Sequence, residues 1–189
     1  MKKQVFTLDI DEDDSPFDDL ALLLFHTAAP NYSFVDDLNR LYGLSLARTE
    51  DMELDGTPWP VYLYHDTMRQ LHYYLIERPL SSGNTAPYWA ARHKMLLLQG
   101  DDATPTADRI YSDFNDLPTP PDPADIHAVE RHSILEAFHS SFTPVSLLDP
   151  TAPLPPSASR KAKKEHDEME RLFTSILDHF DLSRADMEI

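Results

Sequence analysis

Hydrophobic runs with the spacing of β-strands are concentrated in the first hundred residues of the chain. Two aromatic-rich runs, at residues 59–66 and 71–76, flank a short polar stretch. This pattern is typical of a β-hairpin, with its turn at residues 66–69. A more apolar run at residues 95–98 predicts a third strand, buried beside the hairpin. We expect these three strands to form the centre of the core.

Upstream of the hairpin, the pattern predicts two strands and a helix. Residues 5–10 alternate between apolar and polar side chains, as in a strand with one wet face. Residues 20–25 are uniformly apolar, which favours a buried strand, although periodicity alone does not separate a strand from a buried helix here. Ser33 with Asp36 approximates a capping box, and Gly43 suits a left-handed stop. We therefore predict a helix that residues 30–33 open and that stops at Gly43.

The remaining segments of the body carry weaker patterns. Residues 44–54 mix apolar and charged side chains, so a short strand and a loop both fit. Residues 107–114 can form one short helix. Asp122 as cap, with Pro123 in the first turn, predicts the start of another helix. The apolar positions of residues 126–138 do not fall on one stripe, so a helix, or a strand followed by a helix, remains possible.

The end of the chain combines a stiff linker with a strongly amphipathic helix. Residues 150–159 are rich in proline, and apolar residues then recur at three- and four-residue steps. Such a stripe must be buried, either on the same domain or against another chain. We take part of it as the candidate partner-binding surface: Met169, Leu172, Phe173, Ile176 and Phe180.

These elements indicate an α+β fold in which an antiparallel or mixed sheet is covered by helices. Residues 1–149 form the predicted α+β domain, residues 150–159 the linker, and residues 160–189 the C-terminal helix and tail. A single core is expected because 189 residues support one domain.

Charge narrows the range of partners. Sixteen basic residues against 33 acidic residues give a formal net charge of −17, which repels nucleic acid and anionic membrane surfaces. No run approaches the roughly 18 apolar residues of a membrane span, and acids follow residues 4–8 where a signal peptide would continue apolar. We therefore expect a cytoplasmic protein. The absence of cysteine excludes disulfides and thiolate chemistry.

Motifs for catalysis or for a cofactor are not found. The nine histidines form no ligand motif, and the four glycines form no phosphate-binding loop. The acid run at residues 9–14 fails as an EF-hand because Asp14 occupies the position of the sharp-turn glycine. We expect no metal and no cofactor. The aromatic hairpin has the composition of a ligand pocket, although cross-strand aromatic pairs also stabilise any hairpin; its residues are Tyr62, Tyr64, His65, His72, Tyr73 and Tyr74.

The first hundred residues resemble the IPExxxVDY family of small uncharacterised bacterial proteins. The resemblance is carried by residues 8–11, 31–32 together with 38–39, 43–48, 73–76 and 95–100. In place of the naming motif the chain has Ala86, Pro87 and Tyr88, followed by Arg92, His93 and Lys94. The resemblance implies a layout of elements, and it brings no catalytic residue.

Together these patterns predict a non-enzymatic protein-interaction or adaptor module that binds a protein partner or self-associates. The alternative is a small-molecule-binding domain or an enzyme that uses the aromatic hairpin face. A divalent-cation site in the acid run at residues 9–14 is the weakest hypothesis.

Overall fold

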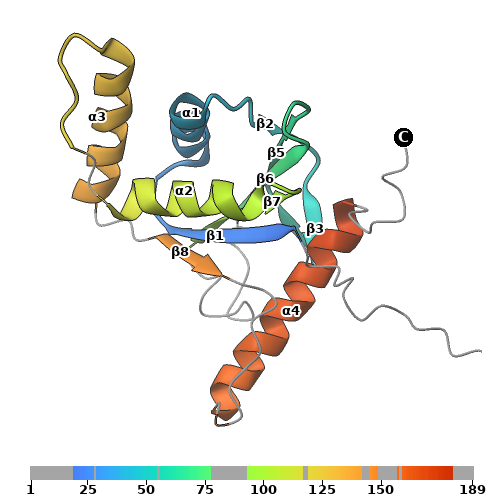
Figure 1. The fold of residues 1–189 in the computed structure, drawn as a ribbon. Coiled ribbons are helices and arrows are strands. Elements are labelled where there is room, and N and C mark those ends of the chain that lie inside the picture. Colours follow the sequence, from blue (N-terminus) through green and yellow to red (C-terminus); the bar gives the residue numbers. More distant parts are fainter. Residues whose placement is uncertain are drawn as a thin grey trace, which may run out of the picture.

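A six-stranded antiparallel sheet forms the centre of the protein (Figure 1). The computed structural model describes residues 19–27, 29–54, 56–77, 93–116, 119–141, 145–148, 157 and 159–180. Within these residues the strand order is β2-β5-β6-β7-β1-β8, and β3 pairs with β4 separately. The strands are β1 (Leu20–His26), β2 (Ala47–Arg48), β3 (Met52–Leu54), β4 (Thr57–Trp59), β5 (Val61–Asp66), β6 (Leu71–Glu77), β7 (His93–Gln99) and β8 (Val145–Leu148). The predicted α+β fold class is confirmed.

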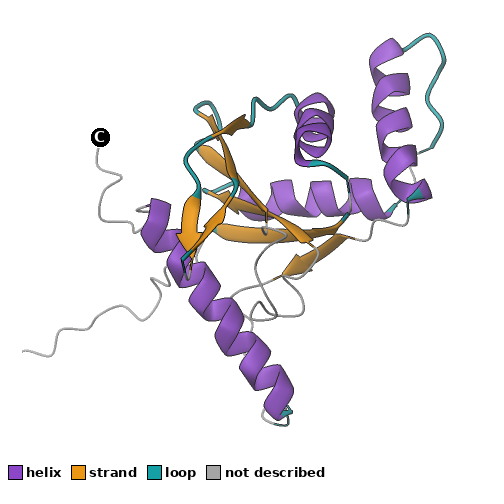
Figure 2. Ribbon diagram, turned by 180° about the vertical axis from the view of Figure 1, so that it is seen from behind, coloured by secondary structure: helices purple, strands orange, loops and turns teal. Residues whose placement is uncertain are grey.

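Helices cover both faces of this sheet (Figure 1). On the first face, here called the helical face, lie α1 (Asn31–Tyr42), α2 (Ala103–Asn115) and α3 (Ile126–Ser140). The opposite face packs against β3, β4 and α4 (Arg160–Phe180). Figure 2 shows α4 on the other side of the sheet from α1 and α2. Because side chains alternate along a strand, each central strand supplies both cores.

The predicted strands at the centre of the sheet are confirmed. The uniformly apolar run becomes β1, which is buried on both faces between β7 and β8. The hairpin is β5 and β6 in the register Tyr64 to Tyr73 and His65 to His72. Its turn covers residues 67–70, one residue later than expected, because Asp66 still pairs with Leu71.

The capping box predicted for α1 was wrong. The helix begins at Asn31 after Pro30, which makes no side-chain cap, so Ser33 lies inside the first turn and forms no capping box with Asp36. The predicted stop is correct, because Gly43 adopts a left-handed conformation with φ of 66°. Because the helix begins at Asn31, Phe34 lies in its first turn, and its side chain is buried in the core.

The start of α3 was also predicted too early. Asp125 is the cap and its carboxylate accepts a hydrogen bond from the amide of Ala128 at 3.0 Å. Asp122 instead closes a local turn by accepting from the Ala124 amide. Residues 126–140 form one helix, and the chain then returns to the sheet as β8, a strand that the hydrophobic pattern did not indicate.

The C-terminal helix packs on the protein's own sheet. Leu172 and Ile176 are 5% and 1% exposed, and they join Met52 and Trp59 in the core of the opposite face. The side chains of Met169, Phe173 and Phe180 lie outside the described residues. Two of the five candidate partner-binding residues therefore belong to the protein's own core.

Several sequence-based expectations fall outside the described residues. They are the strand at residues 5–10, the acid run at residues 9–14, nearly all of the linker, and residues 86–92 of the segment expected to hold the naming motif. Among the helices that the structure describes, none has the length and apolarity needed to cross a membrane.

Candidate functional site

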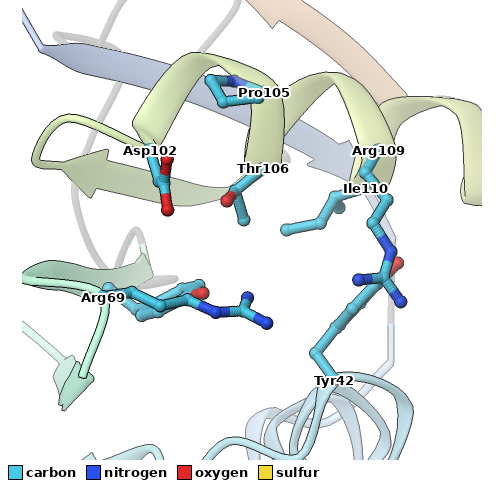
Figure 3. A pocket seen from close by; sticks show the side chains of 8 residues that line it. Tyr42, Arg69, Asp102, Pro105, Thr106, Arg109 and Ile110 are labelled. Carbon is cyan, nitrogen blue, oxygen red and sulfur yellow. The ribbon is translucent and has the colours of Figure 1, made fainter. Parts of the chain in front are cut away.

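A cavity of about 220 Å³ lies on the helical face, between the hairpin turn and α2 (Figure 3). It is smaller than the roughly 300–1,000 Å³ pockets of drug-sized ligands. Its lining combines three charged side chains, one hydroxyl, two aromatic rings and two apolar side chains. These residues are Arg69, Asp102, Arg109, Thr106, Tyr42, Tyr73, Pro105 and Ile110.

Helical spacing explains how α2 supplies its part of the lining. Residues 102, 106 and 109 stand four and three positions apart, so they lie on one side of the helix. The buried stripe of α2 runs beside them, through Ala103, Ala107, Ile110 and Phe114. One edge of α2 is therefore anchored in the core while the adjacent edge faces the cavity. Figure 3 shows Asp102 and Arg109 extending from α2 on either side of Thr106.

The hairpin turn holds Arg69 on the other side of the cavity. The carboxylate of Asp66 accepts hydrogen bonds from the amides of Met68 and Arg69, at 3.1 and 3.2 Å. Gln70 then takes a left-handed conformation, with φ of 52°, and its side-chain amide donates to the carbonyl of Thr67. These local bonds define the turn without an Asn-Gly pair. Figure 3 shows the Arg69 guanidinium reaching across beneath α2.

Gly100 allows the turn and α2 to approach each other closely. It has φ of 132°, and a Cβ atom there would lie 2.2 Å from the carbonyl oxygen of Gln70. Its own carbonyl accepts from the amide of Ala103 at the start of α2. Only glycine fits this backbone contact, so Gly100 sets the distance between the two walls of the cavity.

Tyr42, at the end of α1, is a fixed aromatic wall. Its hydroxyl donates to Asp113 at 3.2 Å, and Arg131 pairs with the same carboxylate while its guanidinium carbon lies 5.5 Å from the Tyr42 ring centroid. Burial, and then the charge of Asp113, raise the pKa of Tyr42 well above its usual range. The phenol therefore stays protonated at neutral pH and serves as a wall.

The cations of the cavity remain available to a ligand. Arg69 has a long contact of 3.8 Å to Asp66 and donates a hydrogen bond to the hydroxyl of Tyr73, and its side chain is 53% exposed. Arg109 forms no ion pair within the part of the chain that the structure describes. Burial raises the pKa of the neighbouring Tyr73, although the charge of Arg69 opposes that shift. Two guanidinium groups thus face the cavity, with neutral tyrosines around them.

The aromatic hairpin is divided between the two faces of the sheet. Tyr62, Tyr64 and Tyr73 belong to the helical face, whereas Tyr74, His65 and His72 share the opposite face. Of these six predicted pocket residues, Tyr73 lines the cavity. The arginines and Asp102 were not anticipated, although the spacing of residues 102, 106 and 109 on a helix is a signal that the sequence contains.

His65 and His72 form a stacked pair on the opposite face, with ring centroids 3.9 Å apart. Burial, and then the charge of His65, lower the pKa of His72 below its ordinary value of 6.5. The unfolded chain therefore takes up a proton at His72 before the folded protein does. The contribution of His72 to stability is complete above pH 6.5, and it is lost as the pH falls through the folded pKa.

As the pH falls from 7.5 to 5, we expect the free energy of unfolding of the wild type to decrease relative to that of a His72→Gln variant. The reason is that only the wild type loses stability through the lowered pKa of a folded His72. Urea denaturation at several pH values measures this difference. A His65→Gln variant, which keeps His72, should show most of the wild type's decrease, because burial is the larger cause of the lowered His72 pKa. A difference that is independent of pH would contradict the assignment.

The buried ammonium of Lys94 has structural partners. Lys94 is 3% exposed beneath the first turn of α1, where its ammonium donates to Glu77 at 2.9 Å and to the side chain of Asn31. No group of three or more histidine or acidic side chains with metal-binding geometry occurs among the described residues. The cavity is therefore the candidate site.

No family model, curated protein or solved structure matches this chain. The resemblance to the IPExxxVDY family thus stays a prediction, and the function must be argued from the cavity itself.

Proposed function

We propose that the protein is a small-molecule-binding domain whose cavity, between the hairpin turn and α2, takes an organic anion. The observation that carries the proposal is the pair of guanidinium groups, Arg69 and Arg109, that face one small cavity in a protein with a net charge of −17. Guanidinium presents a planar fork of donors that matches a carboxylate or a phosphate.

The rest of the lining suits a small ligand with an apolar part. The hydroxyl of Thr106 offers a further donor, while Pro105, Ile110 and the rings of Tyr42 and Tyr73 offer apolar surface. A few convergent polar groups within an otherwise apolar wall are the usual composition of a ligand site. Neither tyrosine can act as a general base at neutral pH, because burial keeps both phenols protonated.

Sodium 4-methylpentanoate is a suitable probe because it combines a carboxylate with a branched apolar tail. We expect its titration into ¹⁵N-labelled protein to shift the amide signals of Arg69, Thr106 and Arg109 with a millimolar dissociation constant. An Arg109→Ala variant should bind at least about tenfold more weakly, because it loses a charge-assisted hydrogen bond.

Arg40→Ala is the matched control. Arg40 lies on α1 outside the cavity and pairs with Glu130 at the surface, so its loss should leave the titration unchanged. Shifts that occur away from the cavity, or an Arg109→Ala variant that binds like the wild type, would refute the proposal.

A further inference from the structure

Asp102 gives the cavity a negative group opposite its cations. It lies at the start of α2, where aspartate commonly caps a helix, yet its side chain accepts no capping hydrogen bond. Its φ and ψ of −93° and 11° differ from the extended conformation that a cap requires. Asp102 also makes no ion pair with any described residue.

The positions of the charges define two ends of the cavity. Asp102 stands one turn before Thr106, and Arg109 stands nearly one turn after it, so the Cα atoms of Asp102 and Arg109 are separated along α2 by about 10 Å at 1.5 Å per residue. Figure 3 shows both side chains on the cavity side of the helix, with Arg69 beneath them. A ligand that lies along α2 meets an anion at one end and cations at the other.

We infer that the ligand is a zwitterion of the amino-acid type, with its carboxylate held by Arg109 and Arg69 and its ammonium held by Asp102. This inference rests on the proposed function, and it names the class of ligand for the same site. The full negative charge of Asp102 exceeds the roughly half positive charge at the amino end of α2, so an ammonium is attracted there. The apolar part of the ligand then contacts Pro105 and Ile110.

Three compounds with the same branched apolar tail separate the effects of the two charges of the ligand. L-leucine carries both, 4-methylpentanoate lacks the ammonium, and 3-methylbutylamine lacks the carboxylate. Titrated into the full-length wild-type protein, leucine should bind about tenfold more tightly than 4-methylpentanoate, and the amine should bind most weakly.

The Asp102→Asn substitution should remove the preference for leucine over 4-methylpentanoate. Binding of 4-methylpentanoate itself should persist or become tighter. Asp108→Asn is the matched control, because Asp108 is exposed on α2 and does not line the cavity. Thermal unfolding of both variants verifies that they remain folded.

The outcomes separate this inference from the proposed function. If 4-methylpentanoate binds as tightly as leucine in the wild type, the inference of a zwitterionic ligand is wrong, whereas the proposed binding of an organic anion is supported. If a preference for leucine survives in Asp102→Asn, the role of Asp102 is refuted. If none of the three compounds shifts the signals of the cavity, both the inference and the proposed function fall.

Discussion

Replacing Gly100 by alanine is expected to lower the free energy of unfolding by about 4 kcal/mol. A side chain at φ of 132° is strained, and the new Cβ atom would lie 2.2 Å from the carbonyl oxygen of Gln70. Because that oxygen belongs to backbone, the hairpin turn must move away from α2 to relieve the contact. Urea denaturation of the variant and the wild type measures the loss.

Gly43→Ala is the control for this substitution. Gly43 also has a positive φ, of 66°, but no atom lies within 4 Å of a Cβ placed there. Its loss should cost only about 1 kcal/mol, the penalty of the left-handed conformation. Equal losses at the two positions would show that the close contact at Gly100 does not hold the turn.

Phe138→Ala is expected to cost about 3–5 kcal/mol, the range for removing a buried phenylalanine. Four rings make edge contacts in a closed cycle, with centroids 5.0 Å apart for Phe25 and Phe34, 5.7 Å for Phe34 and Phe138, 4.9 Å for Phe138 and Phe114, and 5.0 Å for Phe114 and Phe25. The cycle joins β1 to α1, α2 and α3. Removing one ring leaves a cavity where all four elements meet.

Thermal or urea unfolding measures this loss, and Ile126→Ala provides the control on the same helix. Ile126 is apolar but 76% exposed, so its truncation should change stability by no more than about 0.5 kcal/mol. If Phe138→Ala were as mild as Ile126→Ala, α3 would not be packed against α1 and α2. The position of α3 matters for the site, because its Arg131 helps to hold Asp113 and Tyr42.

Local patterns were sufficient for the elements whose sequences carry a clear period or an unbroken apolar run. Aromatic-rich runs around a turn identified the hairpin strands, an unbroken apolar run favoured a strand at β1, and three- and four-residue spacing identified α4. Such patterns succeed because each element buries its own apolar side chains, whatever lies opposite to them.

The two misplaced helix caps show where local patterns fail. Ser33 and Asp122 are both good caps by residue type. At α1 the observed start is tied to other contacts: the side chain of Asn31 accepts a hydrogen bond from buried Lys94, and Phe34 enters the core beneath the same turn. A cap contributes about 1 kcal/mol, whereas burying an aromatic side chain contributes about 1.5–3 kcal/mol, so packing outweighs the cap there. At α3 a different aspartate, Asp125, makes the capping hydrogen bond.

The candidate site was the hardest part to foresee. Arg69 and Arg109 are forty positions apart and come from a turn and a helix. Their proximity depends on the close contact between Gln70 and Gly100, which no spacing rule expresses. The aromatic residues that drew attention first serve mainly as packing, on two different faces of the sheet.

The sequence by itself determined the fold class, the central strands and the amphipathic character of the last helix, because these follow from the period of apolar side chains along a single segment. Only the tertiary structure decided that Leu172 and Ile176 are covered by the protein's own sheet, and that two arginines and Asp102 share one cavity. Such facts depend on contacts between distant segments, where steric fit at one glycine and the packing of a few rings select the arrangement.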